Sequence, residues 1–355
     1  AKQGHDNHVV NVQRWRELMA GRNKNAPKKA PGRSTVQPKL IRRQAEWRYS
    51  ALTEPFLGTE KLYNIEPVTF EDEASAKQNE IVLNWQFRTK INRVRFIDEY
   101  VRTNVDEGSA VVRVGWKRQT ITVQEQVAQF TFVMPESAED VQALEDAIVL
   151  RGNDPRSYEE NVPENIRAAV DFYDETGQPS VAIQSGTETV DVEKIVENRP
   201  TLELIAPENV YIDPSCGGDL DKAMFVVVSF ETSKAELMKA GDRYKNLEYV
   251  NWENASVLAT TDHESRTPQT FNFKDTLRKR IVAYEYWGYY DVEGNDTLVP
   301  IVATWVGDTL IRMERNPFPD EKPPFVVTNY MPIKRELMGE PDAELLEDNQ
   351  AVLGA

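Results

Sequence analysis

The segment AYEYWGYYD, residues 283–291, combines carboxylates with aromatic rings in a way that could do chemistry. Glu285 lies between two tyrosines and near Trp287, and Asp291 closes the segment. Glycosidases pair two carboxylates at the scissile bond, so a carbohydrate-active enzyme using Glu285 and Asp291 is one hypothesis. In a strand, however, Ala283, Glu285 and Trp287 share one face, and aromatic residues favour strands because they pack well there. A purely structural strand is the alternative.

The loop DPSCGGDLD, residues 213–221, places three carboxylates around two glycines. Calcium prefers such oxygen-rich loops, but the spacing is not that of an EF-hand. Cys216, the only cysteine of the chain, lies in the same loop, and no base that could activate it is recognisable nearby. A solvated turn with an ordinary thiol is the simpler interpretation.

His5 and His8 form an H-x-x-H pair, but they fall in a segment that is expected to be flexible. The sequence contains neither glycine-rich nucleotide-binding motif, and it lacks the G-x-S-x-G and H-E-x-x-H motifs. These absences argue against an ATPase, a dehydrogenase, an esterase or a zinc protease. We therefore predict no catalytic residue, no cofactor and no metal site.

Composition indicates a folded protein with room for one or two domains in 355 residues. Hydrophobic residues make up 40% of the chain, which is typical of a globular protein rather than a disordered one. No run of about 18 apolar residues is present, so no membrane span is expected. The basic, polar N-terminus does not resemble a secretory signal, and a single cysteine excludes an intrachain disulfide.

The net charge of −16 is distributed unevenly. Residues 1–50 carry 12 Lys and Arg against 3 Asp and Glu, whereas the other 305 residues carry 30 against 55. A basic arm on an acidic body suits contact with nucleic acid or with an acidic partner, and a flexible solubilising tail is the alternative. The basic residues predicted to make such contacts are Arg14, Arg16, Arg22, Lys24, Lys28, Lys29, Arg33, Arg42 and Arg43.

The elements that would position these residues indicate an α+β fold with long helices and antiparallel sheets. The predicted parts are a basic flexible arm over 1–39, a helical part over 40–119, a strand pair with an acidic helical insertion over 120–200, a mainly β part over 201–330 and the beginning of a helix over 331–355. Within the arm, residues 9–20 are predicted to form a short helix. Residues 281–290, 297–305 and 309–314 are predicted to form a meander.

The helical part is predicted to contain a turn, a short strand and a long helix. Residues 52–58, LTEPFLG, are predicted to form the turn, and residues 62–68 the strand. From Thr69 onward, apolar residues spaced three or four apart predict a helix of about 35 residues. That length exceeds the usual globular helix, so a break near Asn84 or Asn92 is expected.

Five groups of residues resemble, in the same order, the portal proteins of tailed bacteriophages in the podovirus-like branch. They are LTEPF at 52–56 with IEPVTFED at 65–72, DEGSAVVRVGW at 106–116, APENVYIDPS at 206–215, EYWG at 285–288, and the proline-rich segment 316–350 with GEPD at 339–342 and DNQ at 348–350. The resemblance covers nearly the whole chain after residue 45.

The resemblance implies a structural protein without an active site of its own, which forms a homododecameric ring at one capsid vertex of the virion. The implied partners are the major capsid and scaffolding proteins, the terminase large subunit, tail adaptor proteins and the double-stranded DNA that passes through the channel. It implies assembly in the host cytoplasm and no contact with a membrane. An acidic wall would suit a DNA conduit, because it repels the polyanion where a basic wall would hold it.

The sequence also departs from the family. Family members usually continue well beyond this length, and the helix after the GEPD-like segment leads towards the stem, the clip and the crown. The chain therefore resembles the wing region up to the start of a truncated stem helix, and no residue can be assigned to terminase docking. Two alternatives remain open: another virion component such as a head–tail connector or tail protein, and the carbohydrate-active enzyme.

Overall fold

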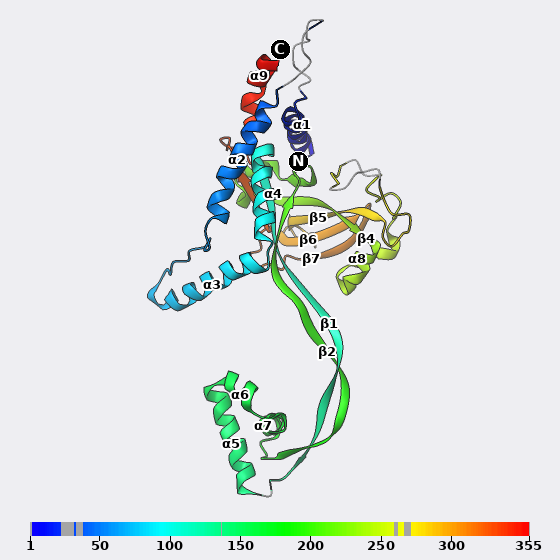
Figure 1. Ribbon diagram of the computed structural model, residues 1–355. Coiled ribbons are helices and arrows are strands. Elements are labelled where there is room, and N and C mark those ends of the chain that lie inside the picture. Colours follow the sequence, from blue (N-terminus) through cyan, green and yellow to red (C-terminus); the bar gives the residue numbers. More distant parts are fainter. Residues whose placement is uncertain are drawn as a thin grey trace. The chain divides into compact units, whose positions relative to one another are not determined.

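The computed structural model describes residues 2–22, 32, 38–135, 137–258, 262–265 and 271–354. The chain divides into two compact units, a larger one formed by Ala1–Trp116 with Arg199–Ala355 and a smaller one formed by Lys117–Asn198. Helices and antiparallel sheets make up the chain, as the predicted α+β class requires (Figure 1). None of the helices in the described ranges is long and apolar enough to cross a bilayer.

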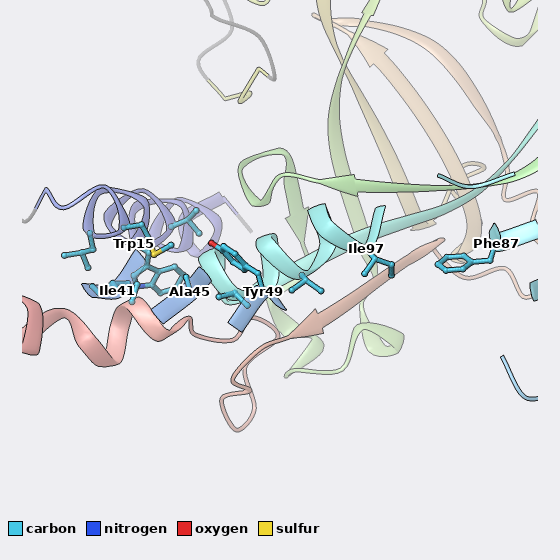
Figure 2. Close-up of a cluster of buried hydrophobic side chains, with 12 residues drawn as sticks. Trp15, Ile41, Ala45, Tyr49, Phe87 and Ile97 are labelled. Atoms are coloured by element: carbon cyan, nitrogen blue, oxygen red, sulfur yellow. The ribbon is translucent and has the colours of Figure 1, made fainter. Parts of the chain in front are cut away.

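Helices α1, α2, α4 and α9 form the helical core of the larger unit. Their buried apolar side chains meet along the helices, and Figure 2 shows Trp15, Ile41, Ala45 and Tyr49 grouped together. The helices of this unit are α1 (Lys2–Met19), α2 (Leu40–Leu57), α3 (Glu73–Thr89), α4 (Arg93–Glu107), α8 (Lys234–Lys239) and α9 (Asp342–Gly354).

Helix α1 differs from the expectation of a flexible arm over residues 1–39. It begins at Lys2, seven residues before the short helix that the sequence predicts. Val12, Trp15, Leu18 and Met19 are buried in the core. Because these residues recur every three or four positions, they form one apolar face of the helix. The basic residues of α1 lie outside this buried face. Residues 23–31 and 33–37 of the expected arm lie outside the described ranges.

The predicted turn at residues 52–58 is wrong, because helix α2 continues through it to Leu57. Pro55 stands in the last turn of α2, where its missing N–H removes one hydrogen bond shortly before the helix ends. The backbone N–H of Gly58 then donates to the carbonyl oxygen of Glu54. A proline is therefore a poor signal for a turn when it lies near the C-terminus of a helix.

The predicted strand at residues 62–68 is also absent. Instead, the side-chain oxygen of Asn84 accepts hydrogen bonds from the backbone N–H groups of Leu62 and Tyr63, at 2.8 and 3.1 Å. Asn84 thus lies inside α3 and does not break it. The break falls between α3 and α4, where the Asn92 side chain accepts from the backbone N–H of Arg95 and begins the second helix.

A five-stranded antiparallel sheet forms the second part of the larger unit, with the order β3-β4-β5-β6-β7. Its strands are β3 (Val210–Ile212), β4 (Phe225–Ser233), β5 (Arg280–Tyr290), β6 (Val299–Val306) and β7 (Thr309–Arg315). The last three confirm the predicted meander. Short 3-10 turns lie at Phe70–Asp72, Pro207–Asn209, Pro214–Cys216, Leu220–Lys222, Gly241–Arg243 and Leu247–Tyr249.

A second sheet has the order β2-β1-β8. Its strands are β1 (Ser109–Val133), β2 (Val181–Ile205) and β8 (Phe325–Asn329). Strand β8 is short, and it pairs antiparallel with the first five residues of β1, from Ser109 to Arg113. The far parts of β1 and β2 belong to the smaller unit.

The smaller unit adds helices α5 (Ala138–Asn153), α6 (Pro155–Asn161) and α7 (Glu164–Thr176) to the far parts of β1 and β2. Its core includes Leu144, Tyr158 and Val170, against which Phe132 packs. The Phe132 ring stacks on Phe172 with the ring centroids 4.2 Å apart. The sequence of this unit holds six Lys and Arg against seventeen Asp and Glu, so its net charge of −11 makes up most of the net charge of −16 of the chain.

Candidate functional site

Glu285, the central residue of the enzyme hypothesis, lies in the interior of the five-stranded sheet with its side chain 3% exposed. Its carboxylate accepts a hydrogen bond from the Arg113 guanidinium at 2.7 Å and from the Trp287 indole N–H at 2.5 Å. The Arg113 guanidinium also lies 5.8 Å from the centre of the Trp287 ring, within the range of a cation–π contact. Glu285 is therefore a buried carboxylate whose charge is paired with Arg113.

Asp291 lies at the exposed end of the same strand and closes the following turn. Its carboxylate oxygens accept backbone N–H bonds from Gly294, Asn295 and Asp296 at 2.7 to 3.2 Å. Partial desolvation raises the pKa of Asp291, but these hydrogen bonds outweigh it and lower the pKa. Both carboxylates of the hypothesis are thus engaged in holding the sheet and its turn.

The carboxylates of the loop 213–221 also have local partners. Asp213 accepts backbone N–H bonds from Ser215 and Met224, at 2.9 and 3.0 Å. Asp219 and Asp221 pair with Lys222 and Lys322, each at 3.0 Å. Within the described ranges, no group of three or more metal-ligating residues forms a candidate metal site. Cys216 is buried in the same loop.

His5 and His8 lie on helix α1 rather than in a flexible segment. The His5 ring stacks on Tyr211 with centroids 4.0 Å apart, and its Nε2 lies 3.0 Å from the Glu208 carbonyl oxygen. Burial lowers the pKa of His8. Both histidines line a cavity of about 410 Å³ together with Asn7 and Asn11 of the same helix.

Two of the predicted contact residues, Arg14 and Arg16, are paired within the chain. Arg14 forms ion pairs with Glu344 and Glu347 of α9, the second at 3.4 Å. Arg16 pairs with Glu107 at 2.7 Å and with Glu208. These two arginines join α1 to α9, to the end of α4 and to the turn before β3.

Three other predicted contact residues remain at the surface. Arg22 and Arg43 are exposed and form no ion pair within the described ranges, and Arg42 pairs weakly with Glu46 at 3.5 Å. Lys24, Lys28, Lys29 and Arg33 lie outside the described ranges. Arg22, Arg42 and Arg43 therefore present the basic surface on which the expectation of nucleic-acid or partner contact rests, and the contact itself stays a prediction.

Two of the groups of residues that resemble portal proteins meet at close backbone contacts. Gly108 ends α4 with a φ of 77°, and a Cβ atom there would lie 2.6 Å from the carbonyl oxygen of Gly339. The N–H of Gly339 donates to the Ser109 hydroxyl at 2.7 Å. The DEGS and GEPD segments thus form one junction between α4, β1 and α9. At Gly288 of EYWG, a Cβ would lie only 2.3 Å from the carbonyl oxygen of Met224.

One buried polar cluster had no signal in the sequence. His263 is 6% exposed, and its Nδ1 lies 2.9 Å from the Ser229 hydroxyl. Its Nε2 lies 3.6 Å from Glu231, which in turn pairs with Arg280 at 3.0 Å. Burial lowers the pKa of His263. A serine, a histidine and a carboxylate thus meet beside a cavity of about 220 Å³. Ser229 is itself only 2% exposed. We therefore interpret the cluster as a buried hydrogen-bond network and not as a site with a serine nucleophile.

The places described above hold ion pairs between helices, capped turns and glycines at close backbone contacts. A protein-family model described as phage SU10 portal protein matches residues 1–355, the full length of the sequence. It agrees with the resemblance carried by the DEGS, GEPD and EYWG segments. This chain therefore belongs to the phage SU10 portal protein family.

Proposed function

We propose that this chain is the subunit of a portal ring at the capsid vertex, through which double-stranded DNA is packaged and ejected and to which the tail attaches. The match of the portal family model over residues 1–355 carries the proposal. Portal proteins belong to the capsid vertex of the virion and assemble as oligomers. The specific expectation is a ring of twelve copies.

The charge distribution supports passage of DNA rather than retention of it. Beyond residue 50 the chain has 55 Asp and Glu against 30 Lys and Arg, and the smaller unit is the most acidic part. Phosphates are repelled by such a surface, so DNA would slide past it instead of releasing counterions to bind it. The exposed Arg22, Arg42 and Arg43 form a separate basic surface that could hold nucleic acid or an acidic partner.

The further partners of the proposed ring are the major capsid and scaffolding proteins, the terminase large subunit and tail adaptor proteins. Terminase supplies ATP hydrolysis in such a system, so the portal subunit needs no nucleotide site. No described residue is assigned to terminase docking, because the resemblance places that role in the clip.

Particle images of the full-length gene product test the proposal. We expect closed twelvefold rings with an axial channel that admits a DNA duplex. Particles without a channel would contradict the proposal and favour a different head–tail connector or tail protein. The enzyme alternative has its own test, in which wild type and a Glu285→Gln variant are compared in a glycan-cleavage screen. Cleavage by wild type that is abolished in the variant would support the enzyme.

A further inference from the structure

Beyond the end of β8, strands β1 and β2 continue as a two-stranded ribbon (Figure 1). Its cross-strand contacts run in antiparallel order, with Lys117 2.6 Å from Glu197 at one end and the Ser185 hydroxyl 3.2 Å from the Gln129 carbonyl oxygen further along. Within the described part of the chain, no third strand pairs with the outer edge of β1 over 117–133 or of β2 over 181–196. Both edges therefore offer backbone groups to another strand.

A two-stranded ribbon in water is marginally stable by itself. Stable sheets add further strands or cover their edges, because an open edge is a template for pairing with another chain. Here the helices α5, α6 and α7 pack against the end of the ribbon and leave its edges open. The length of the open edges, about sixteen residues on each strand, makes them the largest unpaired strand surface in the described ranges.

Near the end of the ribbon, one face carries a group of uncovered apolar side chains. Near its end, Phe132 of β1 and Ala182 of β2 point into the core of the smaller unit. Val127, Val133 and Ile183 have the opposite parity along their strands and therefore point to the other face. These three side chains are 39%, 40% and 54% exposed. A group of exposed apolar side chains beside two open edges is the pattern of an interaction surface.

The charges left on the two strands are of opposite sign. Lys117 of β1 and Lys194 of β2 are paired across the ribbon. Within the described ranges, Arg118 of β1 then remains without an ion-pair partner, as do Asp191 and Glu193 of β2. The unpaired charge of β1 is therefore positive and that of β2 is negative. Contact between two β2 edges would bring like charges together, whereas contact of β1 with β2 joins opposite charges.

We propose that the ribbon is a contact surface between neighbouring copies of this chain, with the outer edge of β1 in one copy along the outer edge of β2 in the next. This inference rests on the proposed ring. A head-to-tail contact of this kind uses two different surfaces of each copy and can close into a ring. Backbone hydrogen bonds between the edges hold the copies together, and the exposed aliphatic side chains of the two copies pack side by side on the widened sheet.

Substitutions on the apolar face test the contact in the full-length protein. The double variant Val127→Lys, Ile183→Lys should raise the concentration at half-assembly at least about tenfold, because it places charges among the aliphatic side chains that pack across the joined edges. Mass photometry over a dilution series measures this. Val149→Lys is the matched control, since Val149 is 60% exposed on α5 of the same unit and should not change assembly. Hydrogen exchange of the ribbon amides should slow in the assembled protein relative to the dissociated one.

Cross-linking tests the head-to-tail order. In a Cys216→Ala background, Thr120→Cys and Thr189→Cys chains are mixed with a short bismaleimide. Cross-links should form in the mixture and not in either single variant. Cross-links in the Thr189→Cys chain alone would overturn the head-to-tail order. Rings with unprotected ribbon amides, or with unchanged assembly of the double variant, would overturn the ribbon contact and leave the proposed function standing. Wild type that stays monomeric at every concentration would contradict both.

Discussion

At Glu285 the role of a carboxylate follows from its surroundings. Buried with its side chain 3% exposed, it needs a compensating charge, and Arg113 and the Trp287 N–H supply the charge and a second hydrogen bond. The same rule governs Arg16, which lies between Glu107 and Glu208. Burial raises the pKa of Glu107, although Arg16 counteracts this. These ion pairs stabilise the fold, and removal of one partner alone would leave an uncompensated charge in a buried place.

The Glu285→Gln substitution should lower the free energy of unfolding by about 2 kcal/mol, because it leaves the Arg113 charge without its carboxylate in a mostly buried place. Urea unfolding monitored by Trp fluorescence measures the change. Glu293→Gln, at an exposed position in the next turn, should change stability by less than about 0.5 kcal/mol. Equal effects of the two substitutions would contradict the role given to the Arg113 pair.

His263 makes stability depend on pH. Its ordinary pKa is about 6.5, and burial lowers the pKa in the folded state, so the unfolded state binds this proton more readily. Its contribution to stability is fully present above about pH 6.5 and is lost as the pH falls from there towards the lower folded pKa, by at most about 1.4 kcal/mol per pH unit. Urea unfolding at pH 7.5 and 5.5 should show a smaller loss of stability for His263→Gln than for wild type. Identical losses would refute this role.

At the scale of elements, glycines fix how the helices and strands of the larger unit meet. Gly108 ends α4 in the left-handed region, and its carbonyl oxygen accepts a hydrogen bond from the Tyr330 N–H at 2.9 Å. The same residue touches the backbone of Gly339 and Glu340 just before α9 begins. No side chain fits between these backbones, so the direction of α9 depends on the absence of a Cβ at residue 108.

The Gly108→Ala substitution should therefore destabilise the protein by about 3 kcal/mol or more, the sum of left-handed strain and a backbone clash. Gly177→Ala is the matched control, because Gly177 ends α7 with a φ of 69° and a Cβ atom there would have no other atom within 4 Å. The control should cost only the strain, about 1 to 2 kcal/mol. Thermal unfolding followed by circular dichroism compares the two. A cost for Gly108→Ala no larger than the control would disprove the junction.

For the whole molecule, the uneven charge distribution has two separate parts. Acidic residues outnumber basic ones beyond residue 50. In the basic N-terminal region, Arg14 and Arg16 already form ion pairs with α9 and α4. Removing residues 1–43 would take away the buried face of α1 along with the charges. Substitution of exposed arginines is thus the cleaner way to test nucleic-acid contact.

A triple variant with Arg22, Arg42 and Arg43 changed to glutamine should bind DNA more weakly if these residues contact phosphates. The slope of log binding constant against log salt concentration should become shallower by about 0.9 for each phosphate that the variant no longer neutralises. Fluorescence anisotropy with a labelled duplex at several salt concentrations measures it. The control is a triple Arg→Gln variant at Arg88, Arg95 and Arg102, which are exposed and ion-paired on other helices. An unchanged slope in the first variant would show that these three arginines do not contact DNA phosphates.

Local patterns predict much of the fold, and they fail where a signal has two interpretations. The strand alternation of residues 281–290 and the turns after it predict the meander because each pattern is local. Pro55 indicates a turn by its residue type, although a helix tolerates it near its end. Asn84 indicates a possible break, whereas its side chain holds a distant segment by hydrogen bonds. His263 gives no signal because its partners are far away in the sequence.

By itself the sequence determined the family resemblance, the meander and the surplus of acidic charge, since all three are carried by residue order and composition. Only the tertiary structure decided which charges are free. Arg14 and Glu344 are separated by 330 residues, and Arg113 and Glu285 by 172. Electrostatic and hydrogen-bond energies depend on the distance between atoms in space. The fold sets that distance. Arg14, which the sequence predicts to contact nucleic acid, therefore forms an ion pair between α1 and α9 in the folded chain.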